Sequence, residues 1–70
     1  MVFIEQGKEQ GLDWCLQVVP AVDGRFYPHL QVGTAIKVSP KTYKEEWQAV
    51  DAGRQLLADT LAQREDEINA

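Results

Sequence analysis

The amino-acid sequence predicts an α+β fold, in which a small antiparallel β-meander of about three strands is packed on one face by a single C-terminal amphipathic helix. Apolar and polar residues alternate in the first half of the chain, and glycine-containing turns separate the alternating segments. In the second half, apolar residues recur every three or four positions. Seventy residues form one domain, which buries only about 60% of the surface of its unfolded chain. We expect that domain over residues 1–63, followed by an acidic, frayed tail over residues 64–70.

The first two strands are expected at residues 2–6 and 12–20. The first is a short, partly apolar segment that ends at a polar turn between Gly7 and Gly11. The second strand alternates strictly, which is typical of a strand with one buried face. Its apolar side carries Leu12, Trp14, Leu16 and Val18, and its other side carries Asp13, Cys15 and Gln17.

The third strand is expected at residues 25–38, joined to the second by the three-residue loop Val22-Asp23-Gly24. This loop pairs apolar residues with each other, whereas a two-residue loop would mix apolar and polar residues on both faces. Gly24 suits the left-handed position that closes such a loop. The predicted pairs are Trp14 with Val32, Leu16 with Leu30, and Val18 with Pro28. Because Pro28 lacks an N–H, we expect an edge or a bulge beside it.

Gly33 leaves two alternatives for the segment that follows. One long strand bent at Gly33 keeps Ile36 and Val38 on the face of Leu30. A hairpin at Gly33-Thr34 starts a further strand and sends Ile36 and Val38 to the opposite face. We rank the bent strand first because it keeps the apolar side chains on the buried face.

The helix is expected at residues 42–63, where Thr42 and Glu45 have the spacing of a capping box. Gly53 lies beside the apolar stripe, where it would let the helix approach the sheet closely. We expect Arg54 to lie along the sheet with its guanidinium in water, and Leu56 to point about 100° away from Leu57. The predicted apolar stripe comprises Tyr43, Trp47, Val50, Leu57, Leu61 and, beyond the expected end, Ile68. Burial of Trp47 predicts that Trp47→Ala costs about 3–5 kcal/mol.

The net charge of −4 belongs entirely to the helical part. Residues 1–41 contain four basic and four acidic residues, whereas residues 42–70 contain three basic and seven acidic residues. This distribution argues against non-specific binding of nucleic acid, which needs several unopposed Lys or Arg contacts to phosphate. The single cysteine, Cys15, cannot form an internal disulfide, and we find neither a signal peptide nor a membrane-spanning apolar run. We therefore expect a cytoplasmic location.

The residues offer little for catalysis or metal binding. His29 is the one histidine, and in the predicted register it faces Gln17, while Cys15 faces Gln31. A Cys–His nucleophile pair also needs a cleft and an orienting group. The chain has no CxxC or HExxH spacing for zinc and no glycine-rich phosphate loop. We therefore expect no enzymatic activity, no metal and no cofactor.

The sheet face opposite the helix is the predicted binding surface. One helix covers only one face of so small a sheet, so the other face meets water, a second copy or a partner. A mildly apolar surface that contains tyrosine and little charge is typical of protein interfaces. Leu56 gives the helix a second contact point. The predicted binding residues are Gln17, Val19, Tyr27, His29, Gln31 and Leu56.

The order of elements over residues 12–63, a β-meander followed by one amphipathic helix, resembles several families of very small bacterial and phage proteins. They include HicB-like antitoxin half-folds, double-stranded-RNA-binding-like domains without a first helix, and some anti-CRISPR inhibitors. The resemblance is an analogy of fold, and no functional residues are carried over from these families.

We expect a non-enzymatic protein–protein interaction module of bacterial or phage type, for which homodimerisation is an open alternative because the core is small. It would act through the exposed sheet face or through the acidic helix, which could occupy a basic site on a partner. The second hypothesis is a nucleic-acid-binding protein that uses Tyr27, His29, Arg25 and Lys37 on the sheet. The third is a subunit or fragment of an enzyme whose chemistry lies elsewhere.

Overall fold

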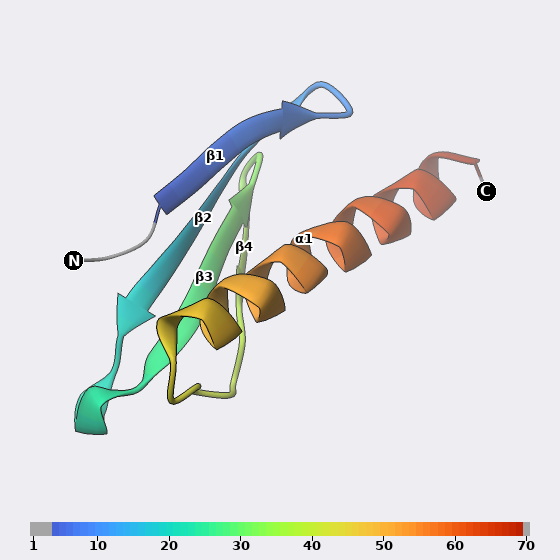
Figure 1. Cartoon of the computed structure of the whole chain (residues 1–70). Helices are drawn as coiled ribbons and strands as arrows, with labels where there is room; N and C mark the ends of the chain where they lie inside the picture. Colours follow the sequence, from blue (N-terminus) through green and yellow to red (C-terminus); the bar gives the residue numbers. More distant parts are fainter. Residues whose placement is uncertain (1–3, 70) are drawn as a thin grey trace.

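The chain folds into a four-stranded antiparallel sheet with one helix across one of its faces (Figure 1). The computed structural model describes the backbone of residues 4–69 and the side chains of residues 4–64. The strands follow one another in the order β1-β2-β3-β4. Their bounds are Ile4–Glu9 for β1, Leu12–Pro20 for β2, Phe26–Val32 for β3 and Ala35–Val38 for β4, and helix α1 spans Glu46–Asn69. The predicted α+β class is confirmed, with four strands instead of three.

The predicted register of the central hairpin is confirmed. Trp14 lies opposite Val32, Leu16 opposite Leu30, and Val18 opposite Pro28. The loop has three residues, as the backbone N–H of Ala21 donates to the carbonyl of Arg25 at 2.7 Å. Within it, Gly24 has the expected left-handed conformation (φ 69°), and so has Asp23 (φ 70°). Burial of one continuous apolar face therefore selects this register over the two-residue loop.

The prediction of one long strand bent at Gly33 is wrong, and the second alternative holds. Gly33 (φ 58°) and Thr34 form a turn, after which β4 returns antiparallel to β3, with Val32 opposite Ala35. The hairpin supplies hydrogen-bond partners to the far side of β3, which a bent strand would leave unpaired. Ile36 and Val38 consequently lie on the face opposite Leu30, with 60% and 50% of their surfaces exposed.

Pro28 lies where the pairing of β3 changes partner, which confirms the predicted edge. Strand β4 ends at Val38, which pairs with His29 and does not reach Pro28. Beyond the proline, Phe26 and Tyr43 exchange two backbone hydrogen bonds of 2.7 Å each. The missing N–H of Pro28 thus falls between two paired regions, where no partner is lost.

The helix begins at Glu46 because Tyr43 is still in an extended bridge to β3. The predicted start at residue 42 and the Thr42–Glu45 capping box are therefore wrong. Instead, the side-chain oxygen of Gln48 accepts a hydrogen bond of 3.1 Å from the backbone N–H of Glu45, which satisfies one of the free donors at the helix start. At the other end, the helix continues to Asn69 rather than stopping at residue 63. The expected stripe position at Ile68 lies outside the described side chains.

The core lies between the helix and the two central strands. The helix runs diagonally over β2 and β3 (Figure 1), and Gly53 occupies the point of closest approach. A Cβ built on Gly53 would overlap a methyl carbon of Leu16 and lie 3.1 Å from Cβ of Pro28. This confirms the predicted close approach of the helix backbone. The buried hydrophobic residues are Leu16, Val18, Leu30, Val32, Ala49 and Val50.

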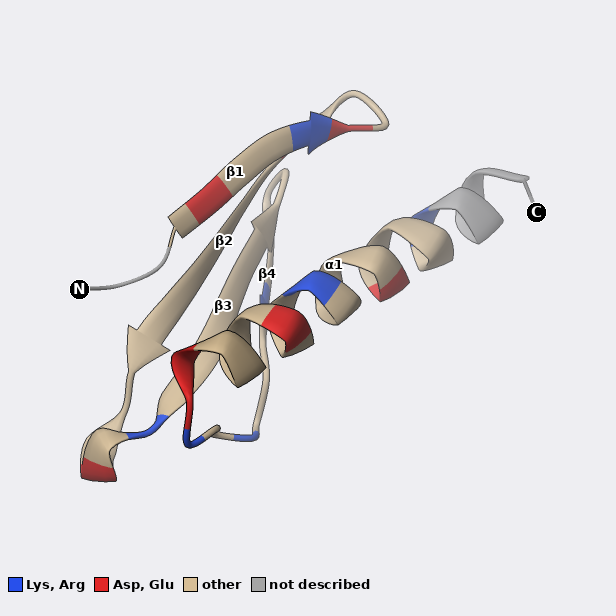
Figure 2. Ribbon diagram, viewed as in Figure 1, with Lys and Arg blue, Asp and Glu red and all other residues tan. Residues whose placement is uncertain are grey.

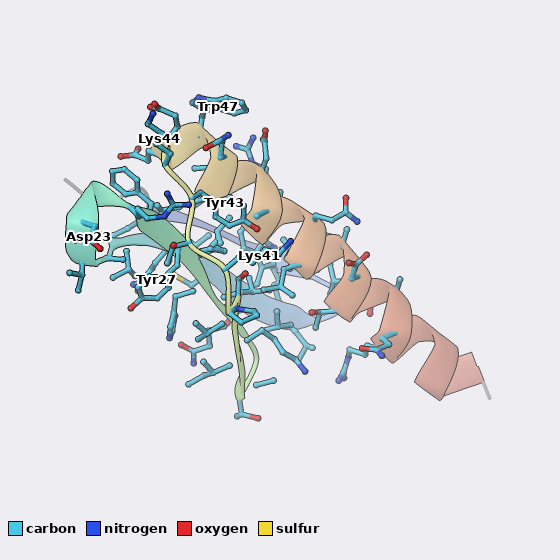
Figure 3. All side chains as sticks on the ribbon, turned by 90° about the horizontal axis from the view of Figure 1, so that it is seen from below. Asp23, Tyr27, Lys41, Tyr43, Lys44 and Trp47 are labelled. Atoms are coloured by element: carbon cyan, nitrogen blue, oxygen red, sulfur yellow. The ribbon has the colours of Figure 1, made fainter. Side chains whose placement is uncertain are left out.

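Trp47 lies outside this core, so its predicted burial is wrong. Its side chain is 63% exposed and projects from the first turn of the helix away from the sheet (Figure 3). The cause is the rotation of the helix, which directs Ala49 and Gly53 to the sheet. Two residues along a helix correspond to about 200°, so Trp47 lies nearly opposite Ala49. The same rotation turns Leu56 inward, against the buried cluster of Leu16, Leu30 and Val32.

Gly53→Ala should lower the free energy of unfolding by about 1–3 kcal/mol, because the added methyl overpacks Leu16 and Pro28. It should do so although alanine favours a helix over glycine by about 1 kcal/mol. Urea denaturation followed by circular dichroism measures the change. Ala58→Gly, at an exposed position of the same helix, measures the difference in helix propensity between alanine and glycine without any contact to the sheet. A stabilised Gly53→Ala variant would show that the helix stands further from the sheet.

Trp47→Ala should change the free energy of unfolding by about 0.5 kcal/mol or less, as is usual for an exposed side chain. Leu16→Ala, at a fully buried position, should cost about 2–5 kcal/mol. The two variants can be compared in the same denaturation series. Equal destabilisation by both would mean that Trp47 is part of the core.

Candidate binding surface

The sheet face turned away from the helix is the candidate binding surface, here called the outer face. Residues paired across antiparallel strands share a face, so the register assigns its members. One row across the sheet is Ile4, Gln17, His29 and Val38, and the next is Gln6, Cys15, Gln31 and Ile36. The pair Val19 and Tyr27 extends the face at one end, and the pair Lys8 and Asp13 extends it at the other.

Five of the six predicted binding residues lie on the outer face. Gln17 pairs with His29 and Val19 pairs with Tyr27, and all four are half-buried, while Gln31 is exposed. Seen from below, Tyr27 projects from β3 on the side opposite the helix (Figure 3). The structure therefore brings these five residues together on one surface.

Leu56 is the predicted binding residue that the structure separates from the others. It lies on the helix side of the sheet and is half-buried against the core. Part of Leu56 also lines a shallow groove between the helix and the segment after β4. The other lining residues of this groove include Val38, Pro40, Tyr43, Ala52 and Asp59.

Three exposed apolar residues of the outer face were missed in the sequence. The bent strand predicts Ile36 and Val38 on the buried face, whereas the alternative turn at Gly33-Thr34 predicts them on the outer face, where they lie. Ile4, which is 60% exposed, belongs to a first strand that is only weakly marked in the sequence. These residues give the outer face apolar margins on both edges of the sheet, around a more polar centre.

The outer face is nearly free of charge. Strand β3 contains no charged residue, and the charged positions lie mainly along β1, in the loops and on the helix (Figure 2). Lys8 and Asp13 are the charged residues that the register places on this face, and they form a cross-strand pair at its end. Charged groups are costly to bury in an interface, so this face can be covered without burying many unpaired charges.

Arg25 and Lys37, the two basic residues of the nucleic-acid hypothesis, lie outside the outer face that carries Tyr27 and His29. Arg25 donates to Thr42, from Nε to the hydroxyl at 2.8 Å and from Nη2 to the carbonyl at 2.9 Å, so it ties the start of β3 to the segment before the helix. Lys37 pairs with Leu30 and is therefore on the helix side of the sheet. Among the described residues, the basic group on the outer face is Lys8, which is paired with Asp13 at its end, whereas a nucleic-acid platform needs several unopposed basic groups.

The helix surface carries mixed charge over its described side chains. Between residues 46 and 64, Glu46, Asp51 and Asp59 are set against Arg54 and Arg64. Arg54 forms an ion pair with Glu5 of β1, from Nη2 to Oε2 at 3.0 Å. The hydrogen bond and the charge of Glu5 raise the pKa of Arg54 above its usual value. The Arg54 side chain as a whole is 53% exposed, and its guanidinium lies against the carboxylate of Glu5 at the surface.

Cys15 and His29 lie on neighbouring strands of the outer face and do not pair directly with each other. Cys15 is a free thiol opposite Gln31, and His29 is opposite Gln17, as the register predicted. Within residues 4–64, no three His, Cys, Asp or Glu side chains gather closely enough to hold a metal ion. The described part of the chain also has no helix with the length and hydrophobicity needed to span a bilayer.

Comparison of the chain with protein-family models, with curated proteins and with solved structures finds no match. The features of the molecule that bear on its function are therefore the outer face, the edges of the sheet and the helix surface.

Tyr27→Ala should leave the fold intact and lower the free energy of unfolding by about 1 kcal/mol or less, through lost contact with Val19 across the strands. Thermal unfolding and the amide NMR spectrum test this expectation. Loss of the folded state would mean that the face of Tyr27 is part of the core.

Proposed function

We propose that the protein is a non-enzymatic protein–protein interaction module that binds its partner through the outer face. The observation that carries this proposal is the nearly charge-free outer face, left uncovered beside a single helix and bordered by Ile4, Ile36 and Val38. Apolar margins and a centre of amide, imidazole and phenol groups offer both contact area and hydrogen bonds to a partner. We propose that this interaction takes place in the cytoplasm of a bacterial or phage-infected cell.

The helix is the other surface considered for this function, and two features rank it second. Its described charges include both signs, and Arg54 is already engaged with Glu5. Attraction to a basic partner is therefore weak over residues 46–64, and it would be screened further by salt. Nucleic-acid binding ranks below both surfaces, because Arg25 and Lys37 do not join Tyr27 and His29.

A capture experiment with paired variants tests the proposal. Wild-type protein, His29→Glu and Asp51→Lys are each immobilised and exposed to lysate of the source cell, and retained proteins are identified by mass spectrometry. His29→Glu places a charge in the middle of the outer face, whereas Asp51→Lys reverses a charge on the exposed side of the helix. We expect a partner that is retained by wild type and Asp51→Lys and lost with His29→Glu.

The reverse pattern, with the partner lost only in Asp51→Lys, would assign recognition to the helix. Circular dichroism of each bait shows that the variants are folded. Titration with single-stranded and double-stranded nucleic acid at low salt tests the remaining hypothesis. Binding that weakens steeply as salt rises would overturn the proposed function.

A further inference from the structure

The two edges of the sheet differ in how well they resist pairing with another strand. Strand β1 carries Glu5, Lys8 and Glu9 among its six residues. Charged side chains on an edge strand are a common means of preventing edge-to-edge association. Strand β4 has the sequence AIKV with one charge. Its two larger apolar residues, Ile36 and Val38, are 60% and 50% exposed. The edge at β4 is therefore the one open to a further strand.

The turn before β4 determines which backbone groups face this edge. In a two-residue hairpin, the residues that flank the loop form a hydrogen-bonded pair, and such pairs alternate along the strands. Val32 and Ala35 flank the Gly33-Thr34 turn, so Ala35 and Lys37 direct their backbone groups toward β3. Ile36 and Val38 direct theirs outward. Among the described residues, none of the backbone hydrogen bonds outside the regular elements reaches Ile36 or Val38.

We propose that a second copy of this chain pairs its β4 antiparallel with the first, about a two-fold axis that passes through Ile36. This places Ile36 opposite Ile36 of the second copy, as a hydrogen-bonded pair, and Val38 opposite Thr34. The most exposed apolar side chains on this edge then cover one another on the outer face. A two-fold interface is self-complementary, so one short strand supplies both halves of the pairing.

The positions of Lys37 and Pro40 favour this register over the neighbouring registers, in which the two-fold axis is shifted by one residue along β4. Faces must match across the pairing, so the axis can shift to Ala35 or to Lys37. An axis at Ala35 sets Ile36 opposite Thr34, so the two isoleucines no longer cover one another, and the remaining alternative is the register centred on Lys37. That register sets Lys37 directly opposite Lys37 of the second copy, and like charges in this position are destabilising. It would also bring the chain at Pro40, which has no N–H, against Thr34. With the axis at Ile36, Lys37 lies opposite Ala35.

The paired copies would form one continuous eight-stranded sheet with both helices on the same face. Their outer faces would then join into a single surface across the axis, which doubles the area proposed above for binding a partner. This inference concerns the edge of the sheet and is independent of which partner the outer face binds. Variants at the edge and variants at the centre of the outer face therefore separate the two proposals.

Oligomeric state is measured by sedimentation equilibrium for wild type, Ile36→Lys and Ile4→Lys. Ile36 and Ile4 are both 60% exposed, on the outer face at opposite edges of the sheet, so Ile4→Lys is the matched control. We expect a dimer for wild type and for Ile4→Lys. In Ile36→Lys, two like charges meet on the axis, so the dimer dissociation constant should rise by about tenfold or more. A monomeric wild type, or a dimer that Ile36→Lys leaves unchanged, would overturn the proposal.

Cross-linking tests the register with single cysteines in a Cys15→Ser background. Cα atoms of a hydrogen-bonded antiparallel pair are about 5.5 Å apart, within the range that a disulfide spans. We expect Ile36→Cys to form a disulfide-linked dimer in a mild redox buffer, and Ile4→Cys to remain unlinked. Linking through Lys37→Cys in preference to Ile36→Cys would place the axis elsewhere and contradict the proposed pairing. Circular dichroism confirms that each variant is folded.

Discussion

The close approach of the helix backbone to the sheet at Gly53 is the contact on which the rest of the structure depends. Leu16 and Pro28 occupy the space that a side chain at this position would need. This contact fixes the rotation of the helix, with Ala49 toward the sheet and Trp47 away from it. It also fixes where the helix crosses, over β2 and β3, where the fully buried side chains of Leu16 and Leu30 lie. In so small a core, one glycine therefore determines which face of a long helix is inside.

The crossing position also explains which surfaces remain open. A single helix covers about two strands of a sheet whose strands are about 4.8 Å apart. Strands β1 and β4 are left at its margins, and no element among the described residues covers the outer face. β1 is held by the ion pair of Glu5 with Arg54 and by the ring of Trp14, which lies over Gly7 so that a Cβ there would be 2.8 Å from the indole. Among the described strands, β4 pairs with β3 alone. The exposed outer face and the open edge are thus both consequences of covering four strands with one helix.

The sequence predicts the parts of this fold in which local pattern and burial agree. Alternation in the β2 segment, together with the parity of the Val22-Asp23-Gly24 loop, leads directly to the observed pairing of Leu16 with Leu30. The prediction of a bent strand is wrong because it buries apolar Ile36 and Val38, whereas an edge strand leaves them exposed. Trp47 was misplaced for a related reason, since its spacing fits a helical stripe whose rotation is set by Gly53. The spacing of apolar residues along the chain predicts neither where a helix crosses a sheet nor which side chains of an edge strand are buried.

Nuclear Overhauser effects in the free protein test the contact at Gly53 most directly. The packing of Gly53 against the sheet predicts strong effects between the two α protons of Gly53 and the methyl protons of Leu16, because only a glycine backbone comes this close to the sheet. It also predicts that the indole protons of Trp47 show no effects to Leu16 or Val18. Effects from the Trp47 ring to those side chains, with none from Gly53, would contradict it and would mean that the other side of the helix faces the core.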